Sequence, residues 1–184
     1  MTDPRSAWLV VIDMQVIFAD PASDWVTPGF AELLPTVRRL IDAYGSRVAY
    51  TRFVAPKRPT GAWVPYYEQW PFALVPETDP LYDLVPELPT EGRPVISRAT
   101  FGKWDDELAT LLGAEAEMVL VGVSTDCCVL STALAAADAG VRVTVVADAC
   151  AGVSVEDHQR ALDAMALYQP LIEIVSSSAL LAKD

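Results

Sequence analysis

Short apolar runs, rich in β-branched residues, alternate along the chain with segments of helical periodicity. Runs that are apolar throughout are typical of strands covered on both faces of a sheet. The pattern predicts six strands at residues 8–12, 47–51, 93–97, 118–123, 141–147 and 171–175. Between them it predicts four helices at residues 33–44, 105–112, 126–139 and 155–167.

This alternation predicts right-handed βαβ units and therefore an α/β fold. We expect a doubly wound, mainly parallel, six-stranded sheet in the order 3-2-1-4-5-6, with helices on both faces. The chain has 184 residues, of which 52% are hydrophobic, a size and composition that fit one domain over residues 1–184.

Residues 53–94 interrupt the pattern with a long proline-rich segment that contains the aromatic stretch WVPYYEQWPF. A loop of this length in a compact domain commonly forms a lid, a binding loop or a subunit contact. Alternatively, its aromatic side chains form a satellite core under the loop. Both interpretations hold together if the aromatic side chains wall a pocket.

Charge and cysteine content exclude several classes of partner. The chain has 25 acidic and 13 basic residues and a net charge of -12, without a basic cluster, so we expect no nucleic acid. Its apolar runs are shorter than the roughly 18 to 20 residues of a membrane span. Three cysteines make no disulfide framework, and MTDPRSAW lacks the features of a signal peptide. We expect a cytoplasmic homo-oligomer, a dimer or tetramer, that binds a small molecule.

Reactive side chains follow two of the predicted strands. Asp13 comes directly after the first strand, and the adjacent thiols of Cys127 and Cys128 come after the fourth. In the expected strand order these ends are neighbours, so the carboxylate can accept a proton from a thiol. A thiol in the first turn of a helix also feels the helix dipole, which favours the thiolate. The alternative is a buried, inert cysteine and an acid that caps a turn.

Three segments resemble the isochorismatase-like cysteine hydrolases, which include nicotinamidases and N-carbamoylsarcosine amidases. They are LVVIDMQVIF, GVSTDCCVLSTALAAADAGVRVTVVADACAG and the tail from residue 154 to 176. The family nucleophile is the cysteine directly before the valine, which identifies Cys128 as the candidate. Cys127 and Cys150 are then expected to be structural.

The resemblance implies a mechanism in which an aspartate takes the thiol proton, the thiolate attacks a carbonyl carbon and water releases the acyl group. Asp13 matches the aspartate. The peptide between Val123 and Ser124 matches a cis bond of the family, which would direct the N–H groups of Ser124 and Cys128 at the oxyanion. The resemblance also implies two aromatic pocket walls, Phe18 and Trp70.

The chain departs from the nicotinamidases where those enzymes hold a metal. They bind it through an Asp-x-His pair and further histidines after the second strand. This chain has Phe53 and Ala55 at the positions of the pair, and its only histidine, His158, lies in the last predicted long helix. We therefore expect no metal and no other cofactor, and we expect His158 to be structural or on the surface.

A second departure concerns the family lysine, because Arg98 occupies that position in VISRATFGKW. We expect Arg98 to replace the lysine electrostatically beside Asp13 and the thiolate. Two alternatives remain open. Lys103, five residues on, swings in from the loop, or the Arg98 guanidinium binds a substrate carboxylate.

The sequence thus predicts a metal-independent cysteine hydrolase that cleaves a small amide or related C–N bond through a thioester. One alternative is the cleavage of an isochorismate-type vinyl ether. Others are a non-catalytic binding or assembly module that kept the fold, and a thiol redox protein using Cys127 and Cys128. Adjacent cysteines rarely form a comfortable disulfide, which disfavours the redox alternative.

Overall fold

The computed structural model describes residues 7–113 and 117–182. Six strands form one sheet in the order β3-β2-β1-β4-β5-β6, and every pair of neighbours is parallel. The predicted sheet and strand order are confirmed. The strands are β1 (Trp8–Ile12), β2 (Val48–Phe53), β3 (Val95–Arg98), β4 (Glu117–Val123), β5 (Arg142–Ala151) and β6 (Ile172–Val175).

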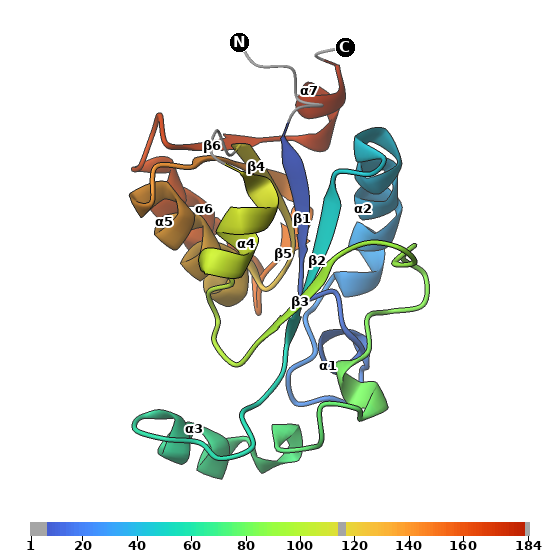
Figure 1. Ribbon diagram of the computed structural model, residues 1–184, viewed down its shortest axis with the longest axis vertical. Coiled ribbons are helices and arrows are strands. Elements are labelled where there is room, and N and C mark those ends of the chain that lie inside the picture. The colour runs from blue at the N-terminus through green and yellow to red at the C-terminus, as the bar shows by residue number, and fades with distance from the viewer. Residues whose placement is uncertain (1–6, 114–116, 183–184) are drawn as a thin grey trace.

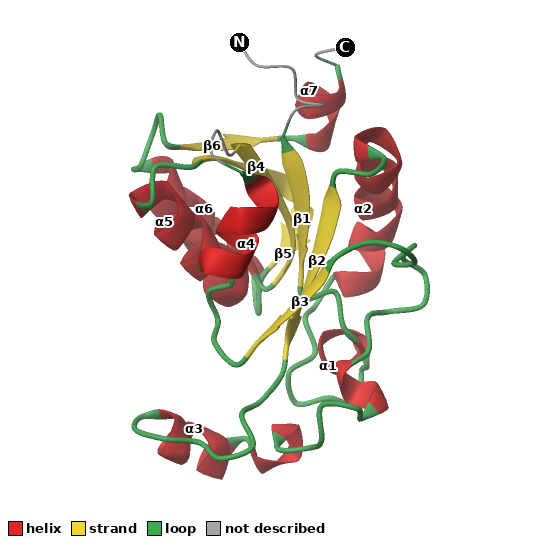
Figure 2. Ribbon diagram, viewed as in Figure 1, coloured by secondary structure: helices red, strands yellow, loops and turns green. Residues whose placement is uncertain are grey.

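Helices cover both faces of this sheet, as Figures 1 and 2 show. On one face lie α2 (Phe30–Tyr44) and α7 (Ser177–Leu181), and on the other lie α4 (Asp106–Leu112), α5 (Leu130–Asp138) and α6 (Val155–Ala166). The predicted helix over 126–139 differs from the structure. Its first turn is a separate π-helical turn, Thr125–Val129, and the regular helix α5 follows. The residues around Cys128 therefore do not belong to an ordinary helix N-terminus.

The core has two halves, one on each face of the sheet. Along β1, Leu9 and Val11 pack on the side of α2, whereas Val10 and Ile12 pack on the side of α5 and α6. All four side chains are fully buried. Burial on both faces explains why this strand is apolar throughout rather than alternating.

The segment between β2 and β3 lies beyond the carboxyl ends of the strands (Figure 1). It contains α3 (Trp63–Gln69) and two 3₁₀ turns (Pro71–Ala73 and Pro80–Tyr82), and α1 (Val16–Ala19) lies at the same end of the sheet. Gln15 holds this segment in place. Its buried side-chain amide donates to Phe53 O at 3.0 Å and Tyr82 O at 2.9 Å, and accepts from Phe53 N at 2.7 Å. One amide thus ties the start of this segment and its second 3₁₀ turn to the end of β1.

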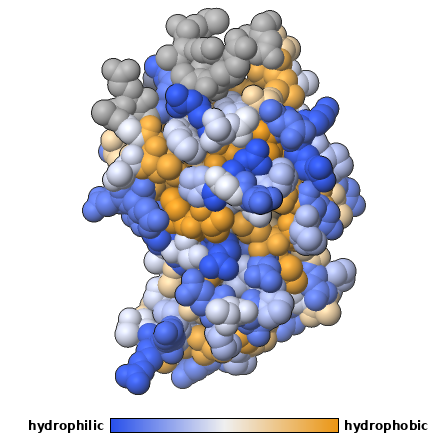
Figure 3. All heavy atoms as spheres, turned by 45° about the vertical axis from the view of Figure 1, so that its right-hand side comes forward, coloured by the Kyte–Doolittle hydropathy of each residue, from blue (hydrophilic) through white to orange (hydrophobic). Residues whose placement is uncertain are grey.

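Hydrophobic and hydrophilic side chains are interspersed on the face drawn in Figure 3, with hydrophobic ones visible across the middle of the molecule. Among residues 7–113 and 117–182, no helix is long and apolar enough to span a membrane.

Candidate active site

The site forms where β1 and β4 end side by side. The two strands run in parallel register, with Ile12 opposite Gly122. Gly122 has φ +112°, and a Cβ built on it would lie 2.1 Å from the carbonyl oxygen of Ile12. Only glycine allows this approach, because any side chain would collide with the neighbouring backbone. The close approach brings the residues after β1 and after β4 to one place.

The chain after β4 forms the turn that carries the two adjacent cysteines. The peptide between Val123 and Ser124 is cis, and Val129 N donates to Ser124 O at 3.1 Å across the π-helical turn. Within this turn the Cys128 side chain is 3% exposed, whereas Cys127 is partly exposed. The turn therefore gives the two thiols different surroundings.

Asp13 is fully buried at the end of β1 and has two partners for its carboxylate. The Thr51 hydroxyl donates to Asp13 Oδ1 at 2.6 Å. The Lys103 ammonium forms an ion pair with Oδ2 at 2.9 Å, and its side chain is also fully buried. The negative charge of the carboxylate also acts on the Cys128 thiol and raises its pKa. An acid and a cation are thus paired in a buried place, and the buried Cys128 thiol lies within reach of their charges.

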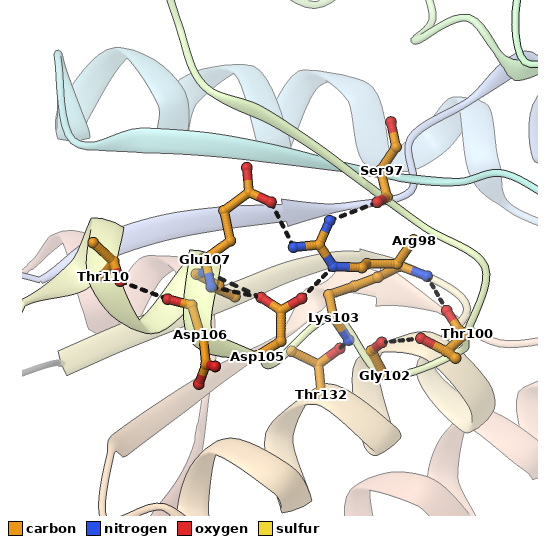
Figure 4. Close-up of polar contacts among 11 residues, drawn as sticks. Ser97, Arg98, Thr100, Gly102, Lys103, Asp105, Asp106, Glu107, Thr110 and Thr132 are labelled. Carbon is orange, nitrogen blue, oxygen red and sulfur yellow. Dashed lines mark hydrogen bonds and ion pairs between the residues drawn. The ribbon is translucent and has the colours of Figure 1, made fainter.

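The cation in this group is Lys103 and not Arg98, so the expectation that Arg98 lies beside Asp13 is wrong. The Arg98 guanidinium binds the Asp105 carboxylate, Glu107 Oε2 at 2.6 Å and Ser97 O at 2.7 Å (Figure 4). These acids, Asp105 first, hold the pKa of Arg98 well above its ordinary value.

The position of β3 explains why Lys103, and not Arg98, lies beside Asp13. Arg98 ends β3, which is the edge strand of the sheet, with β2 lying between it and β1. The following loop, residues 99–104, returns toward the centre and carries Lys103 inward. The acids that follow are the sequence signal for this arrangement, because Asp105 at the N-cap of α4 and Glu107 in its first turn supply partners for Arg98.

The Cys128 thiol holds its proton in the resting site. Complete burial is the main cause that raises its pKa well above the ordinary value, and the nearby Asp13 carboxylate raises it further. The Lys103 ammonium acts in the opposite direction. The expectation that a helix dipole favours the thiolate is corrected accordingly, because desolvation outweighs it in this short π-helical turn. Ionisation of the thiol therefore requires that its proton pass to a neighbour, and Asp13 is in position to accept it.

A cavity of about 370 Å³ opens above the thiols. Its walls include both aromatic residues that the sequence suggested, Phe18 and Trp70. The sequence interpretation assigned no pocket role to Trp25, although this ring contacts five others. Trp25 stacks on Phe18 with ring centroids 6.1 Å apart and meets Phe53, Tyr66, Trp70 and Phe72 at 5.2 to 6.2 Å. The full lining comprises Phe18, Asp24, Trp25, Val26, Thr27, Phe53, Tyr66, Trp70, Phe101, Ser124, Cys127, Cys128 and Val153.

The residues around this cavity do not fit a metal ion. Within the described part of the chain, no group of three or more His, Cys, Asp or Glu side chains is placed to hold one. Phe53 and Ala55 are buried apolar residues. The half-buried His158 has Nδ1 2.8 Å from the hydroxyl of Thr125, so it supports the cysteine turn from α6.

Comparison with known proteins agrees with this geometry. The Isochorismatase domain model matches residues 7–179, and the chain belongs to the isochorismatase family of hydrolases. A cysteine hydrolase from Pseudomonas syringae pv. phaseolicola 1448A superposes with a TM-score of 0.86 at 18% identity, over 99% of this chain and 93% of that one. An isochorismatase-like hydrolase from Alkaliphilus metalliredigens gives 0.83 at 20% identity, over 96% and 98% of the two chains. The pyrazinamidase of Pyrococcus horikoshii in complex with zinc gives 0.76 at 28% identity, over 93% and 99%.

Proposed function

We propose that the protein is a metal-independent cysteine hydrolase that cleaves the C–N bond of a small amide through a thioester on Cys128. One observation carries the proposal. The buried ion pair of Asp13 and Lys103 lies near the Cys128 thiol, on whose pKa both charges act, and this thiol lines an aromatic cavity. Burying two charges is costly, and a buried pair next to a nucleophile is typical of a reactive site rather than of a stabilising core.

In the first half of the reaction, Cys128 Sγ attacks the amide carbonyl carbon while its proton passes to the Asp13 carboxylate. The Lys103 ammonium stabilises the negative charge of the thiol and carboxylate pair throughout this transfer. The backbone N–H groups of Ser124 and Cys128 donate to the developing oxyanion, a contribution of about 3 kcal/mol per donor in comparable sites. The C–N bond then breaks, Asp13 returns the proton to the leaving nitrogen, and ammonia or an amine departs.

In the second half, water attacks the thioester carbonyl and gives one proton to Asp13. The C–S bond breaks, the carboxylic acid leaves, and the proton on Asp13 returns to the Cys128 sulfur. The same carboxylate thus acts as base and then as acid in each half of the reaction.

The cavity supports a neutral, flat substrate. Aromatic rings are the commonest side chains in its wall, and Asp24 is the only charged residue among those that line it. An anionic substrate would meet this carboxylate without a lining cation to balance it. This argument disfavours isochorismate, which carries two carboxylates. It also disfavours the acidic amides that a free Arg98 would have bound, since that guanidinium already has acidic partners.

The proposal includes catalysis without a metal, because Asp13, Lys103 and the two N–H groups supply the acid, base and charge stabilisation that the chemistry needs. Activity is therefore expected to survive prolonged dialysis against a chelator and to show no increase on addition of zinc, iron or manganese. Loss of turnover on chelation, with recovery on adding one of these ions, would contradict this part of the proposal.

The experiment that tests the function is a screen for product release from primary amides, carbamoyl compounds and isochorismate. We expect hydrolysis of one or more neutral aromatic amides by the wild-type protein and none by Cys128→Ala. Cleavage of isochorismate alone would favour the vinyl ether reaction, and no turnover in any class would favour a non-catalytic binding module.

A further inference from the structure

We propose that Thr132 is a positioning residue, whose hydroxyl holds the loop of residues 99–104 on the cysteine turn and thereby sets the place of the Lys103 ammonium beside Cys128. The inference deepens the proposed function and rests on it, since it concerns how that site is assembled. Its test reads the thiol directly and needs no substrate.

The Thr132 side chain is fully buried in α5, one helical turn after Cys128. Its hydroxyl donates to the carbonyl oxygen of Cys128 at 2.7 Å. The Thr132 hydroxyl oxygen in turn accepts a hydrogen bond from the backbone N–H of Lys103 at 3.0 Å (Figure 4). A single oxygen atom therefore joins the backbone of the nucleophile to the backbone of the cation.

The first of these bonds would not by itself indicate a role. Threonine in a helix commonly donates to the carbonyl four residues earlier. Thr110 in α4 does so, with its hydroxyl 2.6 Å from Asp106 O, and it is exposed. The second bond sets Thr132 apart, because it reaches a different segment of the chain at the residue whose ammonium contacts Asp13.

The loop itself is built around the Lys103 side chain. The ammonium donates to Thr100 O at 2.6 Å and lies 5.1 Å from the ring centre of Phe53. The Arg98 guanidinium closes the base of the loop by binding Asp105. At the far end, Gly102 lies against α5, since a Cβ built there would be 3.5 Å from Ser131 O. The Thr132 hydroxyl is thus the polar contact that docks the inner end of this loop on the nucleophile helix.

Loss of the hydroxyl leaves both the Lys103 N–H and the Cys128 carbonyl without this partner in a buried place. We expect the loop to shift and the ammonium to leave its present position. The charged and titratable groups that face the Cys128 thiol are Asp13, Lys103, Cys127 and, from α3, Tyr66. Among them, Lys103 is the one that favours the thiolate, so its displacement makes Cys128 harder to ionise.

The test is the rate at which iodoacetamide alkylates Cys128, followed by peptide mapping between pH 6 and 10. Thr132→Val keeps the shape of the side chain and removes the hydroxyl, Thr132→Ser keeps the hydroxyl, and Thr110→Val removes a matched helical bond elsewhere. We expect Thr132→Val to react about tenfold more slowly at a fixed pH, which corresponds to an upward shift of the profile by about one pH unit. We expect Cys128 in Thr132→Ser and in Thr110→Val to be alkylated at the wild-type rate across this pH range. Thr132→Ala is measured in parallel, so that a folding defect of the valine variant does not remove the test.

The inference would be overturned if Thr132→Val and Thr132→Ala fold and their Cys128 is alkylated at the wild-type rate. A Thr132→Ser variant as slow as Thr132→Val would also overturn it, because the methyl group and not the hydroxyl would then matter. Failure of the proposed function has a different signature. In that case no amide is hydrolysed by the wild type, while the shift between wild type and Thr132→Val is still present.

Discussion

Three buried side chains, Asp13, Lys103 and Cys128, control one proton at the edge of the cavity. The carboxylate and the ammonium are each fully buried, so each charge depends on the other. Removing one partner of a buried pair commonly costs about 3 to 5 kcal/mol, because the remaining charge is uncompensated. The same dependence explains the chemistry. The thiol is kept neutral by burial and becomes a nucleophile only as Asp13 takes its proton.

Replacing Lys103 and replacing Arg98 are expected to have different effects on activity. We expect Lys103→Met to lower kcat/KM by about 100-fold or more, since it removes the charge beside Asp13 and the thiol. The kcat/KM of Arg98→Met is expected to stay within a few-fold of the wild-type value. The half-exposed ion pairs of Arg98 with Asp105 and Glu107 contribute about 1 kcal/mol or less each to the stability of the fold. Kinetics on a substrate from the screen, with thermal unfolding of each variant as a control for folding, check this. An active Lys103→Met beside an inactive Arg98→Met would contradict the assignment.

Between elements, the decisive contact is the one between β1 and β4 at Gly122. Backbone atoms of the two strands come so close at this point that the residues after both strands share one site. Helix α5 contributes by carrying Thr132 one turn after the cysteine turn, and α6 contributes the His158 contact with Thr125. The site is therefore built from strand ends, which are fixed by the sheet, and from one loop that is docked on a helix.

Gly122→Ala is expected to destabilise the fold by more than about 4 kcal/mol or to prevent folding. The added Cβ would lie 2.1 Å from Ile12 O, and a central strand cannot move away from that contact. Gly140→Ala is the matched control, since Gly140 also has positive φ but nothing lies within 4 Å of its Cβ position. We expect it to cost about 1 kcal/mol, from backbone strain alone. Urea unfolding measures both, and equal losses would show that the close approach of β1 and β4 is unimportant.

The sequence predicted the elements better than it predicted the loops, and the reason is physical. The apolar runs indicate buried strands, and their alternation with helices predicts the strand order. Together with the family resemblance they predict the positions of Asp13 and Cys128. The path of the loop after β3 depends on pairings such as Arg98 with Asp105, which no periodicity records. For that reason the sequence favours Arg98 as the cation, leaves Lys103 as an open alternative and gives no signal for the central place of Trp25.

At the scale of the whole molecule, buried groups with raised pKa values make the protein less stable as the pH rises in the alkaline range. Burial raises the pKa of Cys150 from 9.0 to about 12 and that of Tyr44 from 10.0 to about 12. Because these folded-state values lie above the unfolded ones, their contribution is fully present below the unfolded pKa. It is lost as the pH rises through the window between the unfolded and folded values.

The free energy of unfolding is therefore expected to fall from about pH 9 toward pH 12. For Cys150, the loss by pH 11 is on the order of 2 to 3 kcal/mol. Urea unfolding at pH 7, 9 and 11 measures the decline, and Cys150→Ala is the informative variant. It is expected to be less stable at pH 7 because of the cavity it leaves, yet to lose less on going from pH 9 to pH 11. An equal decline in both proteins would show that Cys150 does not contribute to it.

Locating the acyl group during turnover tests directly whether Cys128 is the nucleophile. A substrate from the screen is mixed with the wild-type protein, the reaction is quenched with acid, and the peptides are mapped by mass spectrometry. In a parallel reaction, hydroxylamine intercepts a thioester as the hydroxamate. We expect an acyl group on Cys128, hydroxamate formation by wild type and by Cys127→Ala, and neither in Cys128→Ala. Hydrolysis that continues in Cys128→Ala, or an acyl group found on Cys127, would contradict this expectation.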